Sequence, residues 1–289
     1  MYCDFFGFAE KPFTITPNPQ FIYLSGNHRE AFAHLLYGID SHAGFIAMTG
    51  EVGTGKTTVL RTLLSQLDPE KYTSALIFNP CLSGVQLLAS ICRDFGIKAA
   101  KKNSFTYLEA LNHYLLEQNA AGRTVVLVID EAQKLAPEVL EQVRLISNLE
   151  TERDKLIQII LAGQPELDAI FSRHDLRQLN QRITVRCKLS PMGLDDTKEY
   201  ISHRLKISGS RIPGLFSSGA VKLIYRFSGG NPRLINVACE HALIMAWTRE
   251  SLTITPSIAA EVIAEAGAVA PRRGRRLWER IVGLFVPGK

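Results

Sequence analysis

Two hydrophobic patterns alternate along the first 190 residues of the chain. Short, continuous apolar runs are typical of strands buried on both faces of a sheet, and they occupy residues 44–48, 74–78, 125–129 and 156–161. Segments with apolar positions three or four residues apart predict amphipathic helices, and they cover residues 28–39, 59–67, about 84–95, 104–120 and about 137–149. Strands that alternate with helices predict an α/β sandwich around a parallel sheet.

The pattern changes after Pro191. From there to about residue 266 the only periodicity is helical, over residues 195–207, 217–227, 233–248 and 256–266, and it predicts a small all-helical domain. The predicted organisation is therefore an irregular segment over residues 1–27, an α/β domain over 28–190, a helical domain over 191–268 and a basic amphipathic tail over 269–289.

The segment over residues 1–27 is rich in aromatic residues and prolines. Phe5, Phe6, Phe8, Phe13, Phe21 and Tyr23 are interleaved with Pro12, Pro17 and Pro19. Because proline interrupts regular elements, we expect a segment that is wrapped over a core by its aromatic side chains. Alternatively, it lines an adenine pocket or contacts a neighbouring subunit.

The composition is ordinary for a globular protein, with 46% apolar and 21% charged residues. The net charge of +5 permits contact with nucleic acid or an anionic membrane but does not require it. Five cysteines lack C-x-x-C spacing, which argues against a metal site and a disulfide framework. No apolar run reaches the ~18 residues of a membrane-spanning helix, and residues 1–10 lack the basic start of a secretory signal. We therefore expect a cytoplasmic protein with reduced, mostly buried thiols.

A glycine-rich stretch lies between the first predicted strand and the helix that starts near Lys56. Its residues are Gly50, Glu51, Val52, Gly53, Thr54, Gly55, Lys56, Thr57 and Thr58. The spacing matches the P-loop, in which glycines let successive backbone N–H groups face one phosphate and the helix N-terminus adds positive potential. Lys56 can then reach the β- and γ-phosphates of ATP, and the Thr57 hydroxyl can ligate Mg²⁺. A glycine-rich turn without a ligand is the alternative, and the Lys-Thr pair and the two flanking elements argue against it.

Polar residues follow the ends of two predicted strands. Asp130 and Glu131 end the buried run at 125–129, at the edge where parallel sheets place ligand groups. Asp130 is suited to hold Mg²⁺ through water, and Glu131 is suited to orient the attacking water in phosphoryl transfer. Gln164 follows the fourth strand and is suited to sense the γ-phosphate. The alternatives are solvated carboxylates at a strand end and, for Gln164, an amide that caps the turn before Pro165.

Three arginines lie away from this edge. Arg177 and Arg182 are at the distal edge of the α/β domain, where either could reach the nucleotide of a neighbouring subunit as an arginine finger; surface salt bridges are the alternative. Arg233 follows Pro232 at the start of a helix in the helical domain. It could bridge that domain to a phosphate, or be an ordinary arginine at a helix terminus.

Five motifs occur together and in order. They are Gly-Glu-Val-Gly-Thr-Gly-Lys-Thr, Val-Ile-Asp-Glu-Ala-Gln, Leu-Ala-Gly-Gln-Pro-Glu-Leu, Leu-Arg-Gln-Leu-Asn-Gln-Arg-Ile and Gly-Gly-Asn-Pro-Arg. The set, together with the aromatic opening, resembles AAA+ ATPases of the ExeA/GspA (general secretion pathway protein A) type, associated with type II secretion and pilus biogenesis. Related members include transposition ATPases that bind DNA as helical oligomers.

The resemblance covers about residues 1–265 and implies a role for each candidate residue. Lys56 and Thr57 match Walker A, Asp130 and Glu131 match Walker B, Gln164 matches sensor 1 and Arg233 matches sensor 2. Arg177 and Arg182 match the finger region, and either could serve. The implied fold is a P-loop three-layer sandwich followed by a helical lid.

We therefore expect an ATPase that uses Mg²⁺, assembles as a homo-oligomer with a finger supplied in trans, and powers a bacterial secretion or pilus machine. The rival hypothesis is a nucleotide-switched protein of the transposition type that forms filaments on DNA.

The tail adds a membrane hypothesis. Arginines at 272, 273, 275, 276 and 280 accompany an apolar face made by Leu277, Ile281, Leu284 and Phe285. Such a segment can lie in an anionic membrane surface, which would place the protein at the inner face of the inner membrane. The alternatives are a disordered basic tail, a helix docked on the lid, or a segment whose arginines bind DNA phosphates.

Overall fold

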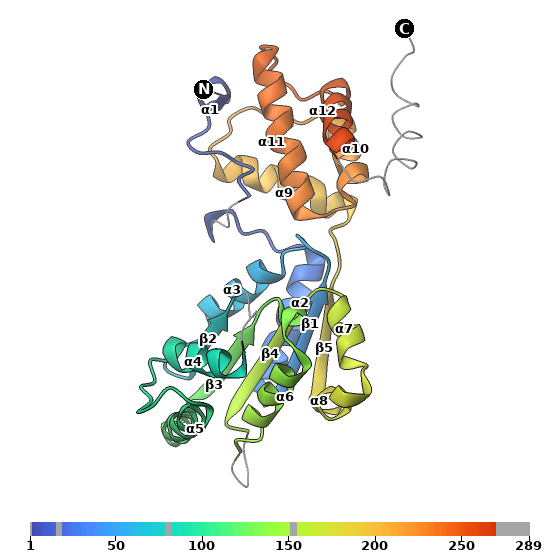
Figure 1. Ribbon diagram of the computed structural model, residues 1–289. Helices are drawn as coiled ribbons and strands as arrows, with labels where there is room; N and C mark the ends of the chain where they lie inside the picture. Colours follow the sequence, from blue (N-terminus) through green and yellow to red (C-terminus); the bar gives the residue numbers. More distant parts are fainter. Residues whose placement is uncertain (1, 16–18, 79–82, 151–154, 270–289) are drawn as a thin grey trace. The chain divides into compact units, whose positions relative to one another are not determined.

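The computed structural model describes residues 2–15, 19–78, 83–150 and 155–269. The chain divides into two compact units (Figure 1). An α/β unit comprises Asn27–Ser190, and a helical unit combines the described parts of residues 1–26 and 191–289. Each unit is described by itself.

The α/β unit contains a parallel sheet of five strands within the described residues, in the order β2-β3-β4-β1-β5. The strands are β1 (Phe45–Gly50), β2 (Tyr72–Ile77), β3 (Thr124–Ile129), β4 (Ile157–Gly163) and β5 (Ile183–Leu189). The three central strands are buried along almost their whole length, which explains their continuous apolar sequences. The predicted α/β sandwich with a parallel sheet is confirmed.

Helices flank the sheet (Figure 1). They are α2 (Gly26–Asp40), α3 (Lys56–Gln66), α4 (Gly84–Asp94), α5 (Ser104–Ala120), α6 (Pro137–Ile146), α7 (Glu166–Phe171) and α8 (Arg177–Arg182), with short 3₁₀ turns η2 (Ala132–Lys134) and η3 (His174–Leu176). Local signals set several starts: Ser83 and Gln86 form a capping box at α4, Asn103 caps α5, and Pro137 is the first residue of α6. Buried side chains of α4, α5 and α6 pack with those of β3 and β4 in one apolar core.

The prediction of four strands is wrong by one, because β5 was not predicted. In β5 the side chains alternate between buried or half-buried Ile183, Val185, Cys187 and Leu189 and exposed Thr184, Arg186 and Lys188. This alternation is typical of a strand with one face in solvent, and β5 lies at an edge of the sheet. A search for continuous apolar runs finds central strands and misses such an edge strand.

The helical unit is built from α9 (Leu194–Ile207), α10 (Ser218–Ser228), α11 (Pro232–Thr248) and α12 (Pro256–Val269). Ser217 and Asn231 cap α10 and α11 with their side-chain oxygens. The start of the chain belongs to this unit and contains α1 (Tyr2–Phe6) and the 3₁₀ turn η1 (Pro19–Phe21). The expectation of an entirely irregular segment over residues 1–27 is therefore corrected.

Aromatic side chains attach the start of the chain to the helices. Tyr2, Phe6, Phe8 and Phe13 are buried in the same apolar core as α9 to α12. The expected wrapping over a core is confirmed, and the core is that of the helical unit. The alternative role at an adenine pocket or a subunit contact stays a prediction.

Arg204 of α9 lies inside this unit, where its side chain joins three segments. Its Nε donates to the Pro12 carbonyl (2.6 Å), its Nη2 to the Thr14 carbonyl (3.4 Å) and its Nη1 to the Tyr200 hydroxyl (2.7 Å). The guanidinium also lies 5.0 Å from the centre of the Phe21 ring. A buried cation thus ties Pro12, Thr14 and Phe21 to α9.

Two further expectations concern thiols and membranes. The described cysteines are free, and Cys92, Cys187 and Cys239 are buried; burial raises the pKa of the Cys92 thiol to about 11. None of the helices in the described ranges is long and apolar enough to cross a membrane. The arginine-rich tail, with Arg272, Arg273, Arg275, Arg276 and Arg280, lies outside the described residues.

Candidate functional site

The predicted P-loop connects β1 to α3. β1 ends at Gly50, and α3 begins at Lys56. Gly53 and Gly55 have φ angles of 80° and 99°, a region that residues with a Cβ rarely adopt. A Cβ at Gly55 would also lie 2.8 Å from His28 Nε2. The tight turn that brings backbone N–H groups toward one point therefore depends on glycine here.

Two polar contacts brace the loop. The Thr54 hydroxyl donates to the Glu51 carbonyl (2.8 Å), and the ring Nε2 of His28 lies 2.9 Å from the Thr54 carbonyl oxygen. The side chains of Thr54 and His28 are both buried, so water does not compete for these hydrogen bonds. His28 was not predicted as a partner of the loop, because it lies 26 residues from Thr54 in the chain and no local pattern links the two.

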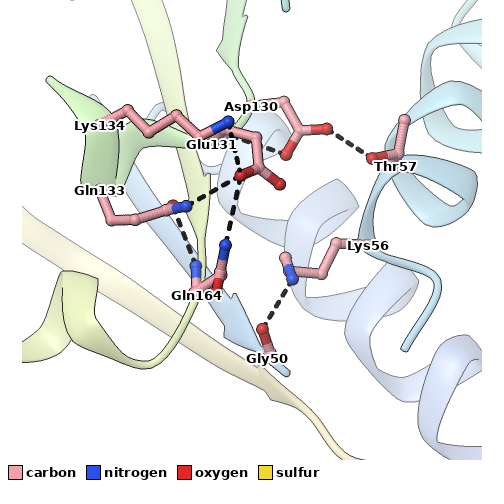
Figure 2. Close-up of polar contacts among 8 residues, drawn as sticks. All are labelled: Gly50, Lys56, Thr57, Asp130, Glu131, Gln133, Lys134 and Gln164. Carbon is pink, nitrogen blue, oxygen red and sulfur yellow. Dashed lines mark hydrogen bonds and ion pairs between the residues drawn. The ribbon is translucent and has the colours of Figure 1, made fainter. Parts of the chain in front are cut away.

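Lys56 is folded against its own loop. It is only 6% exposed. Its ammonium donates to the Gly50 carbonyl at 2.7 Å (Figure 2) and to the Glu51 carbonyl at 3.0 Å. Burial lowers the pKa of Lys56, while the negative charges of Asp130 and Glu131 oppose this effect. The flexible stem of lysine would allow the same ammonium to donate to phosphate oxygens.

Thr57 and Asp130 come from α3 and the end of β3 and are in direct contact. The Thr57 hydroxyl donates to Asp130 Oδ2 at 2.5 Å, and Asp130 Oδ1 accepts the Glu131 backbone N–H at 2.9 Å. Hydroxyl and carboxylate oxygens are suitable ligands for Mg²⁺, which usually takes one or two protein ligands and completes its shell with phosphates and water. The residues present fit Mg²⁺.

Glu131 and Gln164 also meet, at the adjacent ends of β3 and β4. Gln164 Nε2 lies 3.4 Å from Glu131 Oε2, and the same oxygen accepts from Gln133 Nε2 at 2.9 Å and lies 3.3 Å from the Lys134 ammonium (Figure 2). Burial by itself would raise the pKa of Glu131, but hydrogen bonds from Gln133, Lys134 and Gln164 outweigh it and hold the pKa below its usual value. The carboxylate is therefore kept ionised, as an acceptor for a water proton must be.

Gln133 and Lys134 were not predicted as site residues. Gln133 stands at the end of the Val-Ile-Asp-Glu-Ala-Gln motif, so its sequence signal was present without a role attached to it. The turn that carries both residues starts at Glu131, which has a φ of 56°. This left-handed conformation is uncommon for a residue other than glycine, and it directs the chain back across the end of β4.

The remaining predicted loop residues flank these contacts. Val52 is 49% exposed at the tip of the loop, and Thr58 lies in the first turn of α3. For both residues, the predicted contact with phosphate is made by the backbone N–H group.

The two finger candidates lie in and at the start of α8 and differ in their surroundings. Arg182 precedes Ile183, which pairs with Phe45 at the start of β1, whereas the P-loop follows the end of β1. Arg182 therefore lies at the amino-terminal ends of the strands, opposite the end that carries the P-loop. There its Nη1 donates to Ser147 Oγ (2.9 Å). Arg177 is exposed. The structure brings neither arginine to the P-loop of its own chain.

Arg233 belongs to the helical unit. It is exposed in the first turn of α11, where its backbone N–H donates to the capping Asn231 Oδ1 (3.0 Å). Its predicted contact with a phosphate stays a prediction.

The chain is similar in sequence to several known proteins. A family model described as an AAA domain matches residues 39–171. General secretion pathway protein A of Aeromonas hydrophila is 45% identical over 287 residues, which are 99% of this chain and 51% of that protein. DNA polymerase III subunit gamma of Buchnera aphidicola subsp. Schizaphis graminum is 26% identical over 200 residues, or 68% of this chain and 50% of that one. The chain thus spans about half the length of these curated relatives.

Solved structures share the fold at low sequence identity. The Aeropyrum pernix ORC2 protein in its ADPNP-ADP complexes has a TM-score of 0.69 at 17% identity and covers 93% of this chain and 74% of its own. The Thermotoga maritima RuvB branch migration motor has a TM-score of 0.58 at 15% identity, over 91% of this chain and 77% of its own. The resemblance predicted from the motifs is confirmed.

Proposed function

We propose that this chain, which matches an AAA domain over residues 39–171 and is 45% identical to General secretion pathway protein A over 99% of its length, binds ATP with Mg²⁺ and hydrolyses it to ADP and phosphate. We further propose that it assembles with ATP and remodels a bacterial secretion or pilus machine. The observation that carries the proposal is the contact between Thr57 and Asp130, with Lys56 and Glu131 beside it.

Each residue then has one task. The N–H groups of residues 50–58 and the Lys56 ammonium bind the phosphates, and Thr57 and Asp130 hold Mg²⁺, which neutralises charge on the β- and γ-phosphates when bound. Glu131 orients the attacking water and accepts its proton as the water oxygen bonds to the γ-phosphorus and the bond to the bridging oxygen breaks. Gln164, already within reach of Glu131, contacts the γ-phosphate side of the site.

Replacing Glu131 with Gln tests this assignment. The change keeps the size of the side chain and removes the proton acceptor, so we expect ATP affinity to be retained and single-turnover hydrolysis to fall by roughly 10²–10⁴-fold. Isothermal titration with ATP and Mg²⁺ measures the first quantity, and release of labelled phosphate measures the second. An equal loss of binding and hydrolysis would contradict the role given to Glu131.

The oligomer requires an arginine from a neighbouring copy. We propose that Arg177 or Arg182 acts in trans, because neither lies at the P-loop of its own chain. A finger typically contributes ~10³–10⁵ to the rate. Of the two, Arg177 is the one without a hydrogen bond to the body of its own unit in the described structure, whereas Arg182 holds Ser147.

Mixing two inactive variants tests the finger. Arg177→Ala protein should bind ATP and hydrolyse it poorly, and Lys56→Ala protein should lack bound nucleotide while still offering its arginine. Their mixture should hydrolyse ATP faster than the sum of the two, and the same experiment with Arg182→Ala decides between the arginines. If neither mixture exceeds its sum, the arginines are not fingers.

The connection to an envelope machine follows the relative, which is named for the general secretion pathway. If this chain has the same kind of partner, then cells whose only copy is the Glu131→Gln variant should lose secretion or pilus assembly. A normal phenotype together with the loss of ATP hydrolysis in vitro would separate the enzyme activity from that machine.

A second candidate function, a nucleotide-switched scaffold on DNA, has one observation in its favour. Lys98, Lys101 and Lys102 are exposed between α4 and α5, beside Phe105, which is 73% exposed. None of the three lysines forms an ion pair within the described residues. Lysines can hold phosphates and an aromatic ring can stack on a base.

Electron microscopy with a non-hydrolysable ATP analogue, with and without duplex DNA, distinguishes the two functions. Filaments that form on DNA only, with ATPase activity strongly stimulated by DNA, favour the scaffold. Closed oligomers that form without DNA favour the envelope machine.

A further inference from the structure

Gln133 uses both ends of its side-chain amide, and each end reaches the end of a different strand. Its Nε2 donates to Glu131 Oε2 beyond β3 (2.9 Å), and its Oε1 accepts the backbone N–H of Gln164 beyond β4 (3.1 Å) (Figure 2). We propose that Gln133 is a positioning residue that fixes the carboxylate of Glu131 relative to Gln164 for ATP hydrolysis. The inference rests on the proposed function and adds a residue to the same site.

The network itself determines how the amide is oriented. A backbone N–H can only donate, and an ionised carboxylate can only accept. Gln133 must therefore turn Oε1 toward Gln164 and Nε2 toward Glu131, and the reverse orientation would lose both bonds. Glutamine is thus chemically suited to this position in a way that glutamate, which has no donor when ionised, is not.

The contacts also distinguish the two oxygens of Glu131. Gln133, Lys134 and Gln164 all contact Oε2. In the described part of the chain, Oε1 has no protein hydrogen-bond partner. With Oε2 fixed and the rotation of the carboxylate restricted, Oε1 is the oxygen that can face the attacking water.

Among these three contacts, that of Gln133 is the shortest, and the same Gln133 amide also accepts the backbone N–H of Gln164. Lys134 is 42% exposed, and an exposed ion pair of this kind contributes little because water screens it. The bond from Gln164 Nε2 is longer, at 3.4 Å. The side chain of Gln133 therefore has the greatest effect on the position of Oε2.

Gly163, the last residue of β4, provides the space for this amide. A Cβ at Gly163 would lie 2.6 Å from Gln133 Oε1 and 2.9 Å from Leu167 Cδ2. Real Cβ atoms essentially never come so close to a neighbour, so alanine at this position would displace the Gln133 amide without touching Glu131. The two positions give independent ways to disturb one arrangement.

The first test replaces Gln133 with Met, which keeps the length of the side chain and removes both hydrogen bonds. We expect ATP affinity to stay within about twofold and single-turnover hydrolysis to fall about 10–100-fold, as the loss of one hydrogen bond to a charged group and one to a backbone N–H would give. Gln66→Met is the matched control, because Gln66 is exposed at the end of α3 and should leave both quantities unchanged. If Gln133→Met hydrolyses ATP at the wild-type rate, or loses affinity as much as rate, the inference is overturned.

The second test is a double-mutant cycle. Gly163→Ala alone should slow hydrolysis in the same way as Gln133→Met. In a Gln133→Ala background there is no amide to displace, so most of the effect of Gly163→Ala should disappear. Equal effects in both backgrounds would mean that Gly163 acts through Leu167 or β4, and that Gln133 has no positioning role.

A third measurement needs no ATPase activity. The amide proton of Gln164, observed by NMR in the protein without nucleotide, should exchange faster with solvent in Gln133→Met than in wild type and Gln66→Met. If wild type fails to hydrolyse ATP, the proposed function is wrong, and this measurement still decides whether Gln133 holds the end of β4. Unchanged exchange would overturn the inference even in an active enzyme.

Discussion

Two buried cations, Lys56 of the P-loop and Arg204 of the helical unit, are equally hidden from solvent and differ in their partners. Each is 6% exposed, and each donates to two backbone carbonyls. Burying a charge is costly unless hydrogen bonds compensate for the lost water. Low exposure and good hydrogen bonding therefore do not by themselves distinguish a functional cation from a structural one.

Lys56 and Arg204 differ in where their hydrogen-bond partners lie along the chain. The carbonyl partners of Lys56 lie five and six residues away in its own loop, and carboxylates surround it. The partners of Arg204 include Pro12, which is 192 residues away in the chain, and a ring stacks near its guanidinium. A lysine held only by its own loop can be redirected to a ligand at small cost, whereas an arginine that joins distant segments cannot move without separating them.

The largest expected effect is that of Lys56→Ala. The change removes the cation that would bind the phosphates, so we expect ATP affinity to fall by about 100-fold or more, since each charge-assisted hydrogen bond contributes roughly 1.5–3 kcal/mol. The free energy of unfolding without nucleotide should change far less, because the change also removes a buried charge and because Glu51, one of the two partners left behind, is exposed. Titration with ATP and chemical denaturation measure the two quantities. A large loss of stability with retained affinity would place Lys56 in the same class as Arg204.

Arg204→Met should show the opposite behaviour. It keeps a long apolar side chain, removes the Arg204 donor from the Pro12 carbonyl and leaves the Thr14 carbonyl with only the long bond from Asn236 Nδ2 (3.5 Å), so we expect a loss of about 2–5 kcal/mol in the free energy of unfolding of the helical unit. The fluorescence of Trp247, in a Trp278→Phe background, reports on that unit during denaturation.

Tyr200→Phe provides a smaller version of the same change. The hydroxyl accepts from Arg204 (2.7 Å) and donates to Asn236 Oδ1 (2.8 Å), so its removal should cost about 1–3 kcal/mol. ATP affinity at the α/β unit should stay unchanged in both variants. If either variant loses ATP affinity as strongly as Lys56→Ala does, the contrast between the two cations fails.

The comparison also separates what the sequence could predict from what it could not. The P-loop and the strand-end carboxylates were predictable because glycine spacing, a Lys-Thr pair and a continuous apolar run are local patterns. Thr57 and Asp130 then meet as parallel strand topology requires. The edge strand β5 was missed because its alternating side chains resemble a polar connection more than a buried strand.

Contacts between distant residues could not be predicted. His28 reaches the Thr54 carbonyl, and Gln133 reaches the N–H of Gln164, across 26 and 31 residues. In the same way, the role of Arg204 depends on residues near the start of the chain, and its helix alone predicts an ordinary exposed arginine. Pairings of this kind depend on how the elements pack, and one sequence contains no periodic or spacing signal for them.

The smallest effect is expected for the arginines of the tail, which extend the comparison to a third group of cations. Arg272, Arg273, Arg275, Arg276 and Arg280 lie outside the described residues, so their role stays a prediction from sequence. Leu277, Ile281, Leu284 and Phe285 would share one face of a helix, and about ten residues are too few to span a bilayer. They can lie in its surface with the arginines against anionic lipid, each contributing ~1 kcal/mol at most.

We therefore expect the full chain to co-sediment with vesicles that contain anionic lipid, and a version ending at Ala270 not to do so. Vesicles of neutral lipid are the control, because only the electrostatic part should disappear with them. Raising the salt concentration should weaken the interaction, since exposed charges are screened within about 10 Å at 0.1 M salt. If the two proteins sediment equally, the tail is no anchor. Salt-dependent binding of the tail to DNA without binding to vesicles would instead assign its arginines to nucleic-acid phosphates.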